Sequence, residues 1–270
     1  MNGNKILGII IIIALILSVA LVGYGAVNKV VDNDEDNLIE TQHVMDESEL
    51  NKSEVEDTVN GTISTVNLNI NQKTGGANIQ FSDNTTTVYS ITSTEEEAST
   101  NISTHQNGSN LEINIESNSS ENTIVLSNKY KYNITGNFVA GGFAADLNNN
   151  SQVDNINVNT TLGGVTIELN GGSLNTLNVR ITTGGLNIIG EPNGLTTVNS
   201  EIEIGGVNLQ LSKPVADIFS NIELGGINPG DYQQISEDEY KGNDFDSSEN
   251  KLIINNYIRV GGVNTQSFSY

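Results

Sequence analysis

The sequence contains no cysteine and little positive charge. Without cysteine the chain has no disulfide framework, no thiolate metal site and no cysteine for lipid attachment, and the redox state of its compartment is left open. Lys and Arg number 11 against 33 Asp and Glu, which gives a formal net charge of -22 at pH 7. Because nucleic acids are bound through basic surfaces, we expect no nucleic-acid partner.

Residues that commonly carry catalysis are also scarce. The chain has two histidines, His43 and His105, and neither stands near another histidine or a convincing nucleophile in the sequence. No segment joins a glycine-rich loop to the start of a helix pattern, which is the arrangement that binds phosphate groups. The sequence therefore predicts no enzyme, no catalytic residue, no cofactor and no metal site.

Two residue types are unusually frequent. Asparagine occupies 41 of the 270 positions, a usage that favours turns and stacked, exposed columns over helices. Glycine pairs return along the second half of the chain, with first glycines 22, 21, 21, 20 and 36 residues apart. A period near 21 residues predicts a repeat architecture. The pairs are Gly141-Gly142, Gly163-Gly164, Gly184-Gly185, Gly205-Gly206, Gly225-Gly226 and Gly261-Gly262.

Apolar residues alternate with Asn, Thr and Glu on both sides of each pair, as in a half-buried strand. The phase of the alternation shifts at the pair, so one extra residue must be absorbed at a corner, where glycine tolerates positive φ. We expect a buried apolar set at Ile202, Ile204, Val207 and Leu209. In the same columns, the two arginines should form cross-strand ion pairs: Arg180 lies between Asn159 and Glu201, and Arg259 lies beyond Glu203 and Glu223.

Strand, corner, strand and return every 20 to 22 residues describe one coil of a β-solenoid, in which equivalent positions of successive coils bury a continuous core. The predicted fold is therefore all-β, with a regular β-solenoid over residues 133–270. Residues 60–132 contain strand patterns but lose the glycine pairs after Gly75-Gly76, so we expect an irregular N-terminal β layer there.

A long apolar segment stands near the start of the chain. Residues 6–27 carry no charge and are long enough, as a helix, to span a hydrocarbon core of about 30 Å. We expect one transmembrane helix that acts as a signal-anchor, with residues 1–5 as a cytoplasmic tail; a cleaved signal peptide is the alternative. Residues 28–59 are acidic and predict a disordered stalk, after which the C-terminal domain lies outside the cytoplasm.

An acidic insertion at residues 230–251 breaks the repeat. It adds about 15 residues between two glycine pairs and combines acids with three aromatics. Insertions in solenoids often carry binding contacts, although an end cap that shields the last coil is an open alternative. The candidate partner contacts are Tyr232, Glu237, Asp238, Glu239, Tyr240, Asp244, Phe245 and Asp246.

Short motifs in this arrangement resemble a known family. "GGANIQF" and "LEINIE", followed by "GGVTIEL", "GGLNII" and "GGVNLQL", are similar to the putative-adhesin (toast-rack) domains of prokaryotic cell envelopes, over roughly residues 60–270. The resemblance implies a β-solenoid outside the membrane and, in some members, regulation of envelope stress signalling. It implies no catalytic motif, and residues 228–251 depart from its even spacing.

The expected function is that of a membrane-anchored, extracytoplasmic and non-enzymatic β-solenoid. It would act as an adhesin or as a structural or binding protein of the cell surface, with the membrane, surface glycans or envelope proteins as partners. The alternative is an envelope-stress sensor or regulator that acts on a membrane signalling protein. The expected location is the cell membrane, crossed once.

Overall fold

A computed structural model describes residues 39–46, 62–83, 87–95, 100–148 and 150–267. The described residues form strands and turns without a helix, so the predicted all-β class is confirmed. Within these ranges no helix is long and apolar enough to cross a membrane. The predicted transmembrane helix at residues 6–27 lies outside the described residues, as does most of the predicted stalk.

Twelve strands make up the described part of the chain. They are β1 (Ile39–Asp46), β2 (Thr65–Ser82), β3 (Thr87–Glu95), β4 (Thr100–Asn107), β5 (Asn110–Ser127), β6 (Lys131–Asn148), β7 (Gln152–Asn193), β8 (Leu195–Leu211), β9 (Ala216–Asn228), β10 (Tyr232–Gln234), β11 (Glu239–Gly242) and β12 (Lys251–Ser267).

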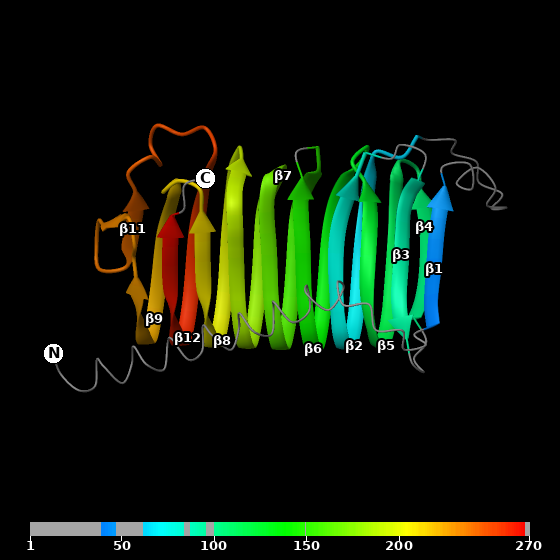
Figure 1. Ribbon diagram of the computed structural model, residues 1–270, viewed down its shortest axis with the longest axis horizontal. Helices are drawn as coiled ribbons and strands as arrows, with labels where there is room; N and C mark the ends of the chain where they lie inside the picture. Colours follow the sequence, from blue (N-terminus) through cyan, green and yellow to red (C-terminus); the bar gives the residue numbers. More distant parts are fainter. Residues whose placement is uncertain (1–38, 47–61, 84–86, 96–99, 149, 268–270) are drawn as a thin grey trace.

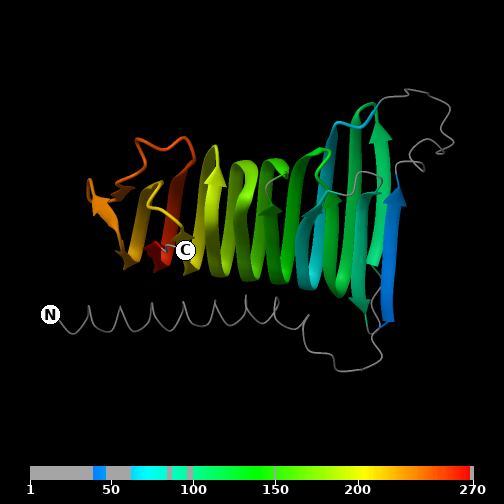
Figure 2. The same cartoon turned by 45° about the horizontal axis from the view of Figure 1, so that its top comes forward.

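All twelve strands belong to one open sheet, with the order β1-β3-β5-β2-β6-β7-β8-β12-β9-β11-β10 and β4 paired to β5. Figure 1 shows the strands side by side along the long axis of the molecule. Figure 2 shows that the ribbon turns repeatedly from one strand into the next, an arrangement consistent with a β-solenoid. We call each turn of the ribbon a rung, the residues before its glycine pair the first arm, and the residues after it the second arm.

Each rung bends at the first glycine of its pair. Gly205 has a φ of 148°, which residues with a side chain rarely adopt. A Cβ atom at Gly205 would lie 1.5 Å from the carbonyl oxygen of Gly184 in the neighbouring rung, so close stacking also excludes a side chain. The first glycines of the other pairs of the regular repeat have φ between 148° and 159°, at Gly141, Gly163, Gly184, Gly225 and Gly261, and Gly75 has a φ of 93°.

The bend at the glycine pair places one residue of the predicted core on the outside. Ile202 and Val207 are buried on either side of the pair, so the phase of the alternation does shift there. Ile204, which was expected in the core, is 43% exposed, because it and Glu203 both point outward before the chain turns. Two consecutive outward residues are how the extra residue is absorbed. Leu162 and Leu224 occupy the same corner position and are also exposed.

Inward-facing residues of both arms form one hydrophobic core. In β7, Ile156 and Val158 precede the glycine pair, and Val165, Ile167 and Leu169 follow it. All five are at most 2% exposed. Because each neighbouring rung repeats the pattern, the core continues along the sheet and needs no helix to cover it.

The N-terminal end is more regular than the sequence indicated. β2 pairs in parallel with β6, with Gly75 opposite Gly141, and β5 pairs in parallel with β2. Antiparallel strands then cover β5, with β4 on its first arm and β3 on its second. β1 lies within the predicted stalk but pairs antiparallel with β3, because a strand there supplies partners for the backbone groups of β3.

The C-terminal end departs from sequence order. β12, the last strand, lies between β8 and β9 and pairs in parallel with both (Figure 1). A buried polar contact accompanies this position: the Ser200 hydroxyl donates to Asn256 Oδ1 at 2.7 Å, and Asn256 Nδ2 donates to the Ser220 hydroxyl at 3.0 Å. The predicted place of Arg259 beyond Glu203 and Glu223 is wrong, because the inserted strand puts Arg259 between them.

Candidate functional site

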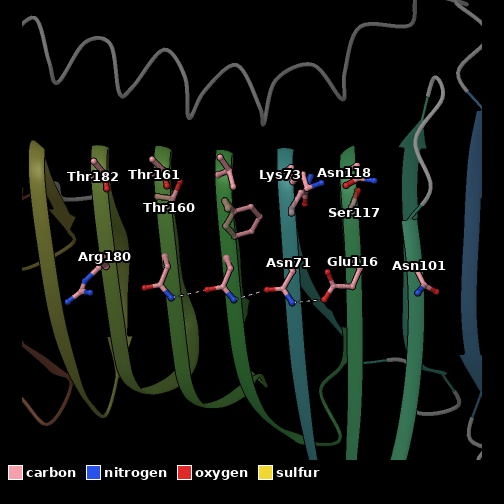
Figure 3. A pocket seen from close by; sticks show the side chains of 15 residues that line it. Asn71, Lys73, Asn101, Glu116, Ser117, Asn118, Thr160, Thr161, Arg180 and Thr182 are labelled. Carbon is pink, nitrogen blue, oxygen red and sulfur yellow. Dashed lines mark hydrogen bonds between the residues drawn. The ribbon is translucent and has the colours of Figure 1, made fainter.

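Two shallow grooves lie on the outer face of the first arms. One, of about 500 Å³, crosses β4, β5, β2, β6 and β7 (Figure 3), and the other, of about 640 Å³, crosses β7, β8, β12 and β9. Asn159 and Arg180 line both grooves, so together they form one continuous surface across the strands. We call this surface the asparagine face.

Outward side chains of the first arms are arranged in two rows that run across the strands. Row A stands four residues before each first glycine, and row B stands six residues before it. In β5, which has no glycine pair, Glu116 and Asn114 lie opposite Asn71 and Asn69 and continue the two rows. In spatial order, row A comprises Glu116, Asn71, Asn137, Asn159, Arg180, Glu201, Tyr257 and Asn221. Row B comprises Asn114, Asn69, Thr135, Asn157, Asn178, Asn199, Asn255 and Phe219.

Amide side chains in row A are joined by hydrogen bonds that all run in one direction. Asn159 donates to Asn137 at 2.9 Å, Asn137 donates to Asn71 at 2.8 Å, and Asn71 donates to Glu116 at 2.7 Å (Figure 3). An ionised carboxylate only accepts hydrogen bonds, so Glu116 requires the NH₂ group of Asn71 to face it. That choice sets the orientation of every following amide in the row.

Row B repeats this arrangement further along the sheet. Asn255 donates to Asn199 at 3.0 Å, Asn199 to Asn178 at 2.9 Å, and Asn178 to Asn157 at 2.8 Å. An amide offers two N–H donors and two acceptor lone pairs. An amide inside the row uses one of each with its neighbours, so it keeps one donor and one acceptor for another molecule. The asparagine face therefore presents repeated, pre-oriented donors and acceptors.

An ion pair interrupts row A. Arg180 donates to Glu201 Oε2 from its Nη2 atom at 2.6 Å and from its Nε atom at 3.0 Å. The predicted ion pair between these residues is thus present. The side chains are 69% and 49% exposed, so the pair contributes little to stability, typically about 0.2 to 1 kcal/mol. Its structural effect is to neutralise two charges in the middle of the groove.

Two aromatic rings are exposed near the C-terminal end of the asparagine face. Phe219 in row B is 40% exposed, and Tyr257 in row A is 41% exposed. The Tyr257 hydroxyl donates a hydrogen bond to Glu223, which together with the negative charge of Glu223 raises the pKa of the phenol. The bond holds the Tyr257 ring beside the groove that it lines.

The insertion at residues 230–251 caps the edge of β9. β11 pairs antiparallel with β9, with Tyr240 opposite Ile218, and β10 pairs with β11. Tyr232 and Phe245 were expected as exposed recognition residues, but they are only 5% and 9% exposed because their rings pack beneath the cap. Lys241 and Lys251 lie 4.9 and 5.0 Å from the centre of the Phe245 ring.

The acidic candidates of the insertion do not gather at one place. Asp238 lines the larger groove, and its backbone carbonyl accepts a hydrogen bond from Ser220 N at 2.8 Å. Glu239 is half-buried in β11, and Asp246 forms a 2.6 Å ion pair with Lys241. The remaining two, Glu237 and Asp244, are exposed. Within the described ranges, no group of three or more His, Cys, Asp or Glu side chains is placed to hold a metal ion.

The asparagine face could have been found in the sequence from the positions of its asparagines relative to the glycine pairs. None of the short motifs marks it. Alignment on the first glycine places Asn71, Asn137 and Asn159 at one offset, and Asn178, Asn199 and Asn255 at another. These offsets differ by two residues, so both rows lie on the same side of the strands. Tyr257 and Phe219 were missed because each occurs once in its row.

Comparisons with known proteins bear on the fold. No protein-family model matches the chain, and no curated protein matches it. Among solved structures, a putative cell adhesion protein from Clostridium sporogenes is similar, with a TM-score of 0.55 and 20% sequence identity. The similarity covers 86% of this chain and 100% of that protein. At this level of identity the likeness shows a shared fold.

Proposed function

We propose that the chain is a non-enzymatic adhesin of the cell surface whose asparagine face contacts other surfaces. The single observation that carries the proposal is that face, where oriented amides line a continuous groove across the rungs. The similar fold of a putative cell adhesion protein supports an adhesin-like role. In this proposal the domain is a toast-rack-like β-solenoid of 20- to 22-residue coils, held outside the cytoplasm by a membrane anchor at residues 6–27.

Binding by such a face differs from binding in a deep pocket. A deep pocket surrounds a small ligand, whereas a shallow groove that crosses many strands contacts an extended one. Each rung adds a similar small contribution, so the affinity increases with the number of rungs engaged. An extended polymer on another surface suits this geometry.

Adhesion by cells that carry the full chain tests the proposal. The full-length protein would be produced on a non-adherent bacterial host, and retained cells would be counted on plates coated with bacterial envelope fragments. We expect retention by the unmodified protein and a loss of most of it with Asn137→Arg and Asn159→Arg together, because two long cations would fill the groove. Asn208→Arg is the matched control, because Asn208 belongs to an amide row on the second arm, outside both grooves.

The result also separates adhesion from signalling. Equal retention by cells with and without the protein, together with chemical crosslinking of the protein to a membrane kinase or transporter, would refute adhesion and favour the regulator. Equal retention by the groove variant and the unmodified protein would refute the asparagine face as the contact.

A further inference from the structure

The charges of the asparagine face indicate what kind of polymer it accepts. Both grooves together are lined by two cations, Lys73 and Arg180, and three acids, Glu116, Glu201 and Asp238. The face is therefore close to neutral, although the whole chain has a net charge of -22. A polyanion would be repelled by the chain, and a polycation would find few carboxylates on the face. The face suits an uncharged polar chain.

The spacing of the amides fits a chain of sugars. Neighbouring strands in a sheet are about 4.8 Å apart, so the amides recur with that period along the groove. The advance per ring of an extended β-linked glycan is close to the same length, and each ring carries hydroxyl groups that both donate and accept hydrogen bonds. One free donor and one free acceptor per amide are the complement of such a hydroxyl.

The distance between the two rows limits the width of the glycan chain that fits between them. Rows A and B are two residues apart along each strand, which is roughly 6.8 Å. A single glycan chain that lies along the grooves therefore meets the amides of row A in the smaller groove and mainly those of row B in the larger one, and the two sets come together on β7. Asn159 on one side and Asn178 on the other belong to neighbouring rungs and line the same groove.

The exposed rings supply the apolar part of the recognition. Sugar rings present C–H groups on their faces, and these faces pack against aromatic rings. Phe219 and Tyr257 lie on adjacent strands at positions two residues apart, and both line the larger groove. A chain that passes from the amide rows toward β9 meets these rings. The amides set its direction, and the rings add apolar contact.

We propose that the asparagine face binds a single extended, neutral, β-linked glycan chain with its axis across the strands and its end against Phe219 and Tyr257. This inference rests on the proposed adhesive function and names its ligand class. A glycan in a cell envelope or matrix is the occupant, and a surface protein is the competing outcome of the test.

Calorimetry with the full-length protein tests the ligand class. The probes are cellohexaose and chitohexaose, which carry hydroxyl and N-acetyl groups respectively, and the corresponding disaccharides. We expect at least one hexasaccharide to bind, and to bind about tenfold or more tightly than its disaccharide, because more rungs are engaged. Absence of binding by both hexasaccharides, or equal affinity for hexasaccharide and disaccharide, would overturn the inference.

Matched variants locate the ligand. Tyr257→Ala and Phe219→Ala should each weaken hexasaccharide binding about tenfold, because each removes one stacking surface. Asn199→Ala should also weaken it, whereas Asn208→Ala should not, because Asn208 lies in an amide row outside the grooves. Equal losses in the Asn199 and Asn208 variants would refute the placement. Circular dichroism of each variant separates lost binding from lost fold.

Adhesion of cells separates failure of this inference from failure of the proposed function. Envelope-coated plates would be treated with periodate, which oxidises sugars, or with protease. Adhesion that disappears only after periodate supports a glycan ligand. Adhesion that disappears only after protease shows a protein partner and refutes the glycan, while the adhesive function stands. Absence of adhesion to untreated plates refutes the function itself.

Discussion

The middle and the C-terminal end of the sheet use the same repeat in different ways. From β6 to β8 the rungs stack in the order in which the chain forms them, and Gly184 pairs with Gly205. At the end, β12 lies between β8 and β9, and Gly261 pairs with both Gly205 and Gly225. The glycine corner therefore sets how two rungs align, and it does not set which rungs are neighbours.

A second feature selects the neighbours at the end. Asn256 is 5% exposed and has a hydrogen-bond partner on each side, Ser200 in β8 and Ser220 in β9. If β12 stacked outside β9, Asn256 would keep only the partner in β9, and Ser200 would face Ser220. A buried polar side chain without its partners is costly, so this contact favours the inserted position. The long insertion supplies the length of chain that reaches it.

The corner glycines give the largest expected effect and compare a crowded first glycine in a middle rung with an open second glycine in the end rung. Gly205→Ala should destabilise the fold by at least about 3 kcal/mol, because it combines a positive φ with a clash against the Gly184 carbonyl. Gly226→Ala should change stability by about 0.5 kcal/mol or less, because a Cβ atom there has no neighbour within 4 Å. Urea unfolding followed by circular dichroism measures both.

Equal losses in the two variants would show that the open site at Gly226 is filled in solution. In that case another rung would have to stack beyond β9 and cover Gly226. A small loss at Gly205 would contradict the close stacking of the glycine carbonyls.

Truncation of core side chains measures how tightly the core is packed in the middle of the sheet and at its C-terminal end. Ile202 in β8 is fully buried, so Ile202→Ala should cost about 2 to 5 kcal/mol. Ile222, the equivalent residue in β9, is partly buried against the core, and Ile222→Ala should cost less. Ile204→Ala should cost under about 1 kcal/mol, because that side chain is 43% exposed. Denaturation midpoints in the reverse order would contradict the placement of the corner.

The buried polar contact tests what selects the order of the strands. Asn256→Val should cost about 1 to 3 kcal/mol, because Ser200 and Ser220 lose their partner. Adding Ser200→Ala and Ser220→Ala should recover most of the loss, because no buried polar group then remains unpaired there. The triple variant should also lose the preference for β12 between β8 and β9.

Disulfide formation reports that preference. Cysteines in place of Asn199 and Asn255, which are opposite each other in β8 and β12, should crosslink in the parent protein and less completely in the triple variant. Complete crosslinking in both proteins would show that the connecting chain alone determines the order, and that Asn256 is not needed for it.

These comparisons show which features the sequence predicts. The spacing of the glycine pairs and the alternation around them predict strands, their corner and most of the core, because both are local patterns. The burial of Ile204 was predicted wrongly, since alternation alone does not show which residue of a corner faces outward. The insertion of β12 was missed because the same glycine corner fits on either side of β9.

The candidate site was less predictable than the fold. Acids and aromatics in the insertion suggested recognition, but Tyr232 and Phe245 are buried by the cap they build. Predicting the asparagine face requires two facts that the amino-acid composition does not contain. These are which positions before the glycine pair face outward, and which rungs are neighbours. Phe219 and Tyr257 come together only because β12 lies against β9.

Substitutions of two carboxylates give the smallest expected effects on stability. One carboxylate lies in the middle of the sheet and the other at its C-terminal end. In the middle of the sheet, Glu168 stacks beside Asp146, and burial followed by this like charge raises the pKa of Glu168. At the end, Asp217 in β9 lies opposite Lys241 of the cap; burial raises the pKa of Asp217, the charge of Lys241 opposes that rise, and the charge of Asp246 adds to it. Repetition thus places like charges together in the middle, whereas the insertion provides an opposite charge at the end, together with the weaker influence of the like charge of Asp246.

The sign of the pH dependence follows from the raised pKa of Glu168. The folded state holds the proton more tightly than the unfolded state, so stability falls as pH rises from the ordinary value of 4.5 through the raised folded value. Glu168→Gln should therefore raise the melting temperature slightly at neutral pH, and the gain should shrink as pH falls through that window. Asp217→Asn should give a smaller gain, because it also removes an attraction to Lys241. Thermal melts between pH 4 and pH 8 measure both, and a gain for Glu168→Gln that grows toward acid would contradict the burial of that carboxylate.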